Sequence, residues 1–199
     1  MPPILFDQCG NRKYLTVRER FAFAHAASKE RQAVSTFCLT LAFTGARISE
    51  VLSLTTNRID TGSHAIIFET LKQRRKSVFR AVPVPCELSA LLAKYGSGRD
   101  GRLWPWGRTN GWKVVKTVMR KAGIVEPLCK PKALRHAFAI ESVQNGVPLN
   151  IVQRWMGHSR LDTTAIYANA LGDEERNLAR ASWRSLESII ESCDPSMRP

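Results

Sequence analysis

Hydrophobic side chains recur at helical spacing through the first part of the chain. Thr16 to Glu19 has the pattern of a capping box, so a helix should begin there. After a second helical stripe, Thr44-Gly45-Ala46 interrupts the period. The spacing therefore predicts helices that begin at Thr16, at about Arg31 and near Ile48.

The period then changes from helical to alternating. Residues 64–70 are β-branched and apolar, and residues 77–84 alternate apolar with polar positions. Between them lies the strongly basic stretch Leu71-Lys-Gln-Arg-Arg-Lys76. This pattern predicts an antiparallel hairpin with a basic turn, to which residues 57–60 add a short third strand.

The remainder of the chain is helical again, with Gly or Pro at several predicted ends. A Ser-x-x-acid cap at Ser159 should open the helix that carries Tyr167. The prediction is an α+β fold, mainly helical with a small antiparallel β-sheet of about three strands. The expected helices are 87–95, 109–122, 132–145, 148–156, 159–167 and 174–191, within one domain over 16–192, preceded by an irregular lead-in (1–15) and followed by a flexible tail (193–199).

The charge balance favours a polyanionic partner. Thirty Lys and Arg against seventeen Asp and Glu leave a formal charge of +13, which attracts nucleic acid through its field and through counterion release. The five cysteines are scattered, and no two are spaced as C-x-x-C, so neither a disulfide framework nor a zinc site is expected. With no signal peptide and no long apolar run, the expectation is a cytoplasmic protein without a membrane partner.

Three segments, in order, resemble the boxes of the tyrosine recombinase (phage integrase) family. Thr44-Gly-Ala-Arg-Ile-Ser-Glu-Val-Leu52 resembles T-G-x-R-x-x-E-L, and Lys132-Ala-Leu-Arg-His-Ala-Phe-Ala139 resembles H-x-L-R-H-x-F-A. Met156-Gly-His158 followed by Thr164-Ala-Ile-Tyr167 resembles the third box. The resemblance covers roughly residues 15–180. It implies a site-specific recombinase that cleaves and rejoins double-stranded DNA through a 3′-phosphotyrosine, with no metal, ATP or other cofactor.

The residue types suit that chemistry on their own terms. A phosphodiester under attack gathers negative charge on its non-bridging oxygens, which Arg meets in a bidentate way. We expect Arg47 and Arg135 to hold the phosphate, and Glu50, three residues after Arg47, to orient its guanidinium. Tyr167 is the only one of three tyrosines in a matching motif, and we assign it as the nucleophile.

The resemblance implies further roles. Lys72 on the hairpin would protonate the leaving 5′ oxygen, with Lys76 as the alternative, and His158 would bond the phosphate or the phenol. Lys132 stands where the family usually has His, and would serve as a general base of lowered pKa or as a third phosphate contact. His136 is assigned a supporting role, packing in the core or buttressing the site. The expected contacts to the DNA backbone are Arg74, Arg75, Lys76, Lys113 and Lys116.

The length of the chain and its last helix bear on assembly. The chain resembles the short members of the family that consist of the catalytic domain alone, so its binding to DNA would be weaker, or helped by an accessory DNA-binding protein. The final amphipathic helix implies exchange between subunits of a homotetramer on two DNA sites, in the nucleoid. The five tryptophans, Trp104, Trp106, Trp112, Trp155 and Trp183, are spaced for core packing.

Each site residue, taken alone, also has an interpretation without a catalytic role. Arg47 alone would be a surface arginine, Arg135 could pair with Glu141, His158 could be a helix cap and Tyr167 a core residue. The ordered set outweighs these readings. Two further hypotheses share the fold: a catalytically impaired DNA-binding accessory protein, and a relaxing enzyme of the type IB topoisomerase kind. A generic RNA-binding protein is a distant fourth, because no RNA-binding signature is present.

Overall fold

The computed structural model describes residues 5–70 and 78–169. The chain divides into two units, Met1–Ala168 and Asn169–Pro199, and all the described residues except Asn169 fall in the first. Several predicted features lie outside the described residues: the basic turn with Lys72, Arg74, Arg75 and Lys76, the helix 174–191 with Trp183, and the tail 193–199.

The first three helices follow the hydrophobic pattern. Helix α1 (Val17–Ser28) has Thr16 as its N-cap, and the capping box with Glu19 is present as expected. Helix α2 (Gln32–Thr44) ends at Gly45, which has φ +58°, and the short α3 (Ile48–Leu52) begins directly after Arg47. The break between α2 and α3 therefore places the first motif at a helix start.

The small sheet has the predicted topology. Its strands are β1 (Ile59–Asp60), β2 (Ala65–Glu69) and β3 (Phe79–Pro83), all antiparallel in the order β1-β2-β3. A short 3-10 helix, η1 (Thr56–Arg58), leads into β1. Along β3 the buried positions are Arg80 and Val82, while Phe79 is exposed, so this strand turns an arginine toward the protein interior.

The second half supplies the remaining helices. They are α4 (Cys86–Gly96), α5 (Arg108–Lys121), α6 (Pro131–Gln144), α7 (Leu149–Met156), α8 (Asp162–Ala165) and the 3-10 helix η2 (Ile166–Asn169). The predicted Ser159 cap is wrong: α8 begins only at Asp162, whose carboxylate pairs with Arg160. Tyr167 consequently lies in the 3-10 turn rather than in a longer α-helix.

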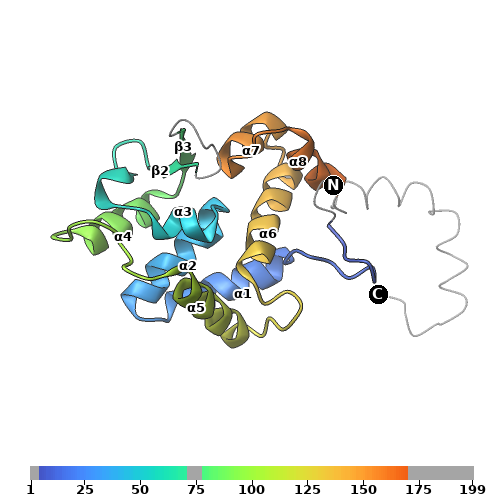
Figure 1. The fold of residues 1–199 in the computed structure, drawn as a ribbon, viewed down its shortest axis with the longest axis horizontal. Coiled ribbons are helices and arrows are strands. Elements are labelled where there is room, and N and C mark those ends of the chain that lie inside the picture. Colours follow the sequence, from blue (N-terminus) through green and yellow to red (C-terminus); the bar gives the residue numbers. More distant parts are fainter. Residues whose placement is uncertain (1–4, 71–77, 170–199) are drawn as a thin grey trace, which may run out of the picture. The chain divides into compact units, whose positions relative to one another are not determined.

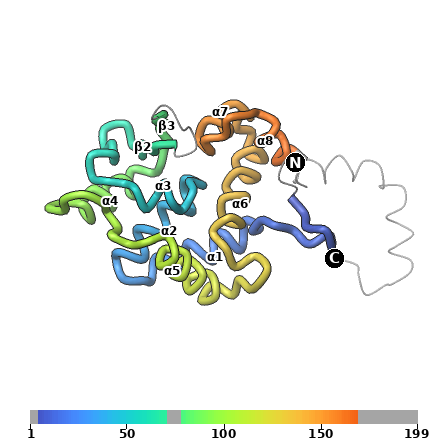
Figure 2. Tube along the Cα trace, in the orientation of Figure 1, coloured from blue at the N-terminus to red at the C-terminus, as the bar shows by residue number. Residues whose placement is uncertain are grey.

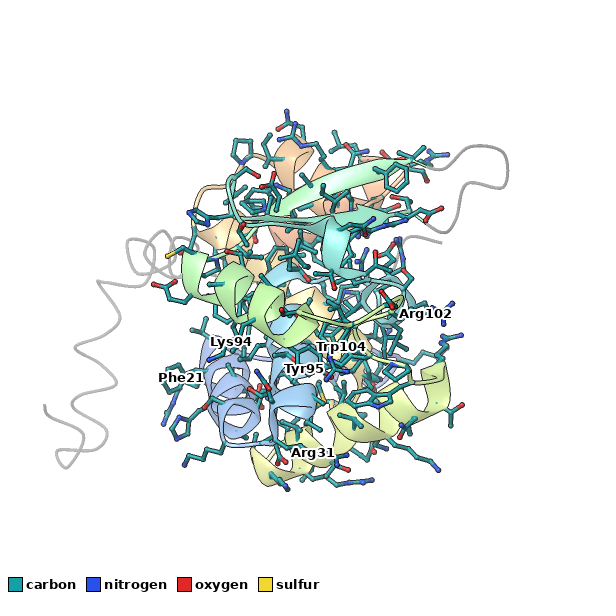
Figure 3. The ribbon with its side chains drawn as sticks, turned by 90° about the vertical axis from the view of Figure 1, so that its left-hand side faces the viewer. Phe21, Arg31, Lys94, Tyr95, Arg102 and Trp104 are labelled. Carbon is teal, nitrogen blue, oxygen red and sulfur yellow. The ribbon has the colours of Figure 1, made fainter. Side chains whose placement is uncertain are left out.

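A single apolar cluster joins the helices and one face of the sheet. At its centre Trp104 contacts the rings of Phe37 and Tyr95, and Figure 3 shows Tyr95 and Trp104 close together while Phe21 lies at the periphery. The indole N–H of Trp104 donates to the Ala33 carbonyl (3.0 Å). Core packing is confirmed for Trp104 but is wrong for Trp112, which is 41% exposed on α5.

The second and third motifs meet beside the sheet. Helix α7 contacts β3, α6 and α8, so segments far apart in sequence lie together (Figures 1 and 2). This arrangement confirms the predicted α+β class, mainly helical with three antiparallel strands. Within the described ranges, no helix is long and apolar enough to cross a membrane.

Gly45 offers a test of this packing. A Cβ there would lie 2.4 Å from Cδ1 of Phe138 and 3.0 Å from its Cβ. Strain at positive φ costs about 1–2 kcal/mol, and the overpacking adds about 1–3 kcal/mol. We expect Gly45→Ala to lower the free energy of unfolding, measured in urea, by about the sum of the two costs.

Gly98→Ala is the matched control, because Gly98 also has positive φ (+71°) but has nothing within 4 Å of its Cβ position. This variant should show the backbone cost alone. Equal losses from both variants would contradict the stated packing of Phe138 on Gly45.

Candidate active site

The C-terminus of α7 gathers three arginines from three different elements. Arg80 Nε donates to the carbonyl of Trp155 (2.8 Å), Arg135 Nη2 to that of Met156 (2.6 Å) and Arg47 Nη2 to that of Gly157 (3.3 Å). Carbonyls at a helix C-terminus lack partners within the helix and carry partial negative charge. They therefore suit cations, and the next residue along the chain is His158.

A fully buried carboxylate lies beneath two of these arginines. Glu50 accepts from Arg47 Nη1 (2.8 Å) and from the Arg47 backbone N–H (2.8 Å), and it receives both Nη atoms of Arg80 (2.7 and 3.3 Å). Burial alone would raise the Glu50 pKa, but hydrogen bonding and charge from Arg80, then Arg47, leave it below its usual value. Glu50 is therefore ionised, and it orients Arg47 as the sequence predicted.

Arg135 is fixed by backbone carbonyls. Its Nη1 donates to Gly45 O (2.7 Å), in addition to the bond to Met156. Burial, and then the charge of Arg47, lower the Arg135 pKa to about 9, which still leaves the guanidinium charged at neutral pH. The alternative pairing with Glu141 is wrong, because Glu141 pairs with Arg20.

The Tyr167 ring lies between two histidines. It is 2% exposed, its hydroxyl is 3.0 Å from His136 Nδ1, and the His158 ring stacks against it with centroids 6.3 Å apart. Burial raises the Tyr167 pKa, against an opposing effect of Arg135 and Arg47. Tyr167 is thus close to the arginines, with its hydroxyl directed to His136.

Both histidines are neutral in this environment. Burial, reinforced by Lys132 and Arg135, lowers the His136 pKa to about 4. Burial with Arg135 and Arg47 lowers the His158 pKa to about 3, and His158 Nδ1 lies 2.9 Å from Thr164 Oγ1. Among the described residues, the buried Nε2 of His136 finds no hydrogen-bond partner, so the contact with Tyr167 is the polar anchor of this ring.

Two open pockets adjoin the arginine cluster, and Arg47 lines both. The first, of about 380 Å³, is also lined by Arg80, His158 and Thr70, the residue that precedes the basic segment 71–76 in the sequence. The second, of about 410 Å³, includes Arg135 and the exposed Lys132. Tyr167 lines neither pocket, and its buried hydroxyl contacts His136 instead.

The structure brings together most of the predicted site residues. Arg47, Glu50, Arg135, His136, His158 and Tyr167 form one cluster, with Lys132 at the rim of the second pocket. Lys113 is exposed on α5, whereas Lys116 pairs with Glu126 and lies 4.5 Å from the Trp112 ring centroid. Within the described ranges, no group of three or more His, Cys, Asp or Glu is placed to hold a metal ion.

Arg80 was missed by the sequence analysis. A usable signal was present, since the alternation over residues 77–84 puts Arg80 on the same strand face as Val82 and Val84. An arginine on an apolar face needs a buried partner. The pattern could not identify Glu50 as that partner, because the two residues are 30 positions apart.

Comparison with known proteins agrees with this geometry. The model of the phage integrase family matches residues 13–174, so the chain belongs to the phage integrase family. It is 29% identical over 180 residues to the tyrosine recombinase XerD of Mycobacterium leprae (strain TN), covering 78% of this chain and 56% of that protein. It is 30% identical over 172 residues to a tyrosine recombinase of Thermosipho africanus (strain TCF52B), covering 82% and 59%. The chain therefore spans little more than half the length of these relatives.

Solved structures share the fold. The crystal structure of XerA recombinase has a TM-score of 0.70 at 23% identity, over 86% of this chain and 65% of that one. The catalytic domain of bacteriophage HP1 integrase has a TM-score of 0.61 at 23% identity, over 78% and 86%. XerH bound to its difH substrate, before cleavage, has a TM-score of 0.70 at 19% identity, over 89% and 59%.

The depressed histidine pKa values make stability depend on pH. Below the ordinary value of 6.5 the unfolded chain takes up protons that the folded chain does not, because the folded values are about 4 and 3. The free energy of unfolding should therefore fall as the pH drops below 6.5. Each of the two histidines should contribute a slope approaching about 1.4 kcal/mol per pH unit.

Urea unfolding at a series of pH values from neutral to about 5 tests this expectation. His136→Asn removes one titrating ring and should reduce the slope by about half. An unchanged slope in that variant would show that His136 does not stay neutral in the folded protein.

Proposed function

We propose that the chain is a site-specific DNA recombinase that cleaves and rejoins strands through a 3′-phosphotyrosine intermediate. One observation carries the proposal: Arg47 and Arg135, from two separate motifs, are anchored on consecutive carbonyls next to His158, with Tyr167 packed on His158. The family membership and the names of the relatives support this activity. The neighbours whose structures contain DNA support DNA as the partner, and the proposed exchange between duplexes makes that DNA double-stranded.

In this mechanism the two arginines bind the non-bridging oxygens of the scissile phosphate. The Tyr167 oxygen attacks phosphorus, the bond to the 5′ oxygen breaks, and the DNA 3′ end is left on the tyrosine. A second 5′ hydroxyl reverses the step and releases Tyr167. Each step exchanges one phosphoester for another, so no external energy source is consumed.

Proton transfers are assigned to neighbouring groups. Lys72 or Lys76, in the basic segment that follows Thr70, protonates the leaving 5′ oxygen. Neutral His158 takes the proton of the Tyr167 phenol as the bond to phosphorus forms, and the reverse step returns both protons. Lys132 is exposed at the rim of the pocket that Arg47 and Arg135 line. That position suits a third phosphate contact, which a lysine makes as a point charge on a flexible stem.

His136 is assigned as the residue that holds the Tyr167 hydroxyl before cleavage. The 3.0 Å contact and the burial of both rings support this role. Because Tyr167 lines neither pocket, cleavage requires its hydroxyl to leave His136 and reach the phosphate. DNA binding would supply that change, since phosphate in the pocket adds negative charge next to the arginines and alters the field around the phenol.

The broader assembly follows from the same proposal. Arg74, Arg75, Lys76, Lys113 and, once released from Glu126, Lys116 would contact the DNA backbone. Each subunit would consist of one catalytic domain over residues 16–192. Recombination between two duplexes implies a homotetramer of these subunits, joined through the C-terminal helix. It would act at the nucleoid. An accessory DNA-binding protein would increase the affinity of the assembly for DNA.

Tyr167→Phe tests the nucleophile. The substrate is a nicked duplex whose sequence is taken from DNA flanking the gene or from a randomised pool. Cleavage next to the nick releases a short fragment that diffuses away. Rejoining is then impossible, and the covalent intermediate accumulates. Wild-type protein should give an SDS-resistant protein–DNA band, and Tyr167→Phe should give none while binding DNA normally. Tyr14→Phe is the control and should behave as wild type.

The alternative functions give different results in the same assay. An accessory protein on this fold would bind DNA without forming a band in either form. A type IB topoisomerase-like enzyme would form the band and relax plasmid that lacks any specific site. Either result would replace the recombinase proposal.

Lys132 is tested by a pair of substitutions. If it contacts phosphate as a cation, Lys132→Arg should keep most of the cleavage rate, while Lys132→Ala should lose about 10²-fold, as for other preorganised contacts. An arginine cannot act as a base. Equal losses in both variants, measured with the trapped substrate, would therefore favour the general-base role.

A further inference from the structure

Arg80 lies outside the three motifs, yet its guanidinium contacts Glu50 of the first motif and the end of α7, just before the third motif. It is 7% exposed on β3. Its guanidinium reaches Glu50, the Trp155 carbonyl at the end of α7, and Thr70 Oγ1 at the end of β2 (3.2 Å). Glu50 in turn supports Arg47, and Trp155 stands three residues before His158.

The hydrogen bonds of Arg80 are almost fully used within the protein. A guanidinium has five N–H groups. Nε donates to the Trp155 carbonyl, Nη1 donates to Glu50 and to Thr70, and Nη2 donates to Glu50. Too few donors remain for a bidentate grip on a phosphate, so Arg80 is suited to act through its neighbours although it lines the first pocket.

Gly157 shows how closely this guanidinium is fitted. A Cβ on Gly157 would lie 2.9 Å from Arg80 Cζ and 2.9 Å from Nη1. The glycine of the third motif thus leaves the space that Arg80 occupies, in addition to ending α7 at φ +62°. Arg80 also lies 5.2 Å from the centroid of the Phe68 ring, which supports its other face.

We propose that Arg80 is a positioning residue for strand cleavage: through Glu50 it sets the direction of Arg47, and through Trp155 it holds the end of α7 that leads to His158. The inference rests on the proposed recombinase function. It assigns to β3 a role in the reaction that none of the three motifs carries.

The test compares Arg80→Met and Arg80→Lys with a matched control. Arg58→Met is that control, because Arg58 also pairs with a glutamate (Glu69, 3.1 Å) and lies over a phenylalanine ring (4.9 Å), near the same sheet. All variants are first compared with wild type by circular dichroism and thermal melting. Cleavage is then measured on a nicked duplex that wild type converts to the covalent adduct.

Loss of alignment by about 1 Å lowers rates by about 10²-fold. We expect that loss in the cleavage rate of Arg80→Met, with DNA affinity within about threefold of wild type, because the binding surface itself is retained. Arg80→Lys should stay close to Arg80→Met, since an ammonium keeps the charge but cannot bridge three partners. Arg58→Met should cleave like wild type.

A substrate with a methylphosphonate at the scissile position distinguishes a positioning defect from a loss of folded protein. The quantity compared is the cleavage rate of each variant relative to wild type on the two substrates. One charged oxygen is replaced by methyl, so the transition state places less demand on Arg47. The defects of Arg80→Met and Arg47→Ala should both shrink to about tenfold or less on this substrate, relative to wild type. A variant that had only lost folded protein would keep the same defect on both substrates.

The outcomes separate the two proposals. Wild-type cleavage with an unimpaired Arg80→Met overturns the positioning role alone. So does full rescue by Arg80→Lys, or a defect that is equal on both substrates. Failure of wild type to form an adduct on any DNA overturns the recombinase function, and this inference with it.

Discussion

Three like charges held in one place are the constraint around which this site is built. Arg47, Arg80 and Arg135 would repel one another and lose hydration if they were simply buried together. They coexist because the last carbonyls of α7 each accept from one of them, and because Glu50 neutralises one charge. Removing one partner of such a buried pair costs about 3–5 kcal/mol, so folding and site geometry depend on the same contacts.

The remaining charge matches the chemistry. Three guanidinium groups and one carboxylate leave two net positive charges, whereas a phosphodiester carries one negative charge and gains another as the phenol oxygen attacks. Under the proposed mechanism, the cluster is therefore more complementary to the transition state than to the bound substrate, which is the condition for acceleration. Neutral His136 and His158 add no further repulsion to the arginines, and the burial of their rings keeps them neutral.

The sequence was sufficient for most of the elements and for the motif residues that gather at the site, but not for Arg80, because local patterns specify elements and motifs and not the contacts between them. The capping box at Thr16, the glycine breaks and the alternating strands each act over a few residues. The contacts between segments were not predictable in this way. The partner of Glu50 lies 30 positions away and the anchor of Arg135 lies 21 away, and neither separation leaves a periodic signal. The prediction of a Ser159 cap was wrong because of a local contact: the Asp162 carboxylate pairs with Arg160, two residues away.

The position of Tyr167 connects stability with control of the reaction. A phenol that is 2% exposed and raised in pKa is a poor nucleophile, and its hydrogen bond to His136 stabilises it away from the pockets. The arginines are held in place by the end of α7, whereas the Tyr167 hydroxyl contacts His136 and lines neither pocket. Under the proposed mechanism, the protein can bind DNA before it can cut, and release of Tyr167 from His136 becomes the step at which DNA or a neighbouring subunit licenses cleavage.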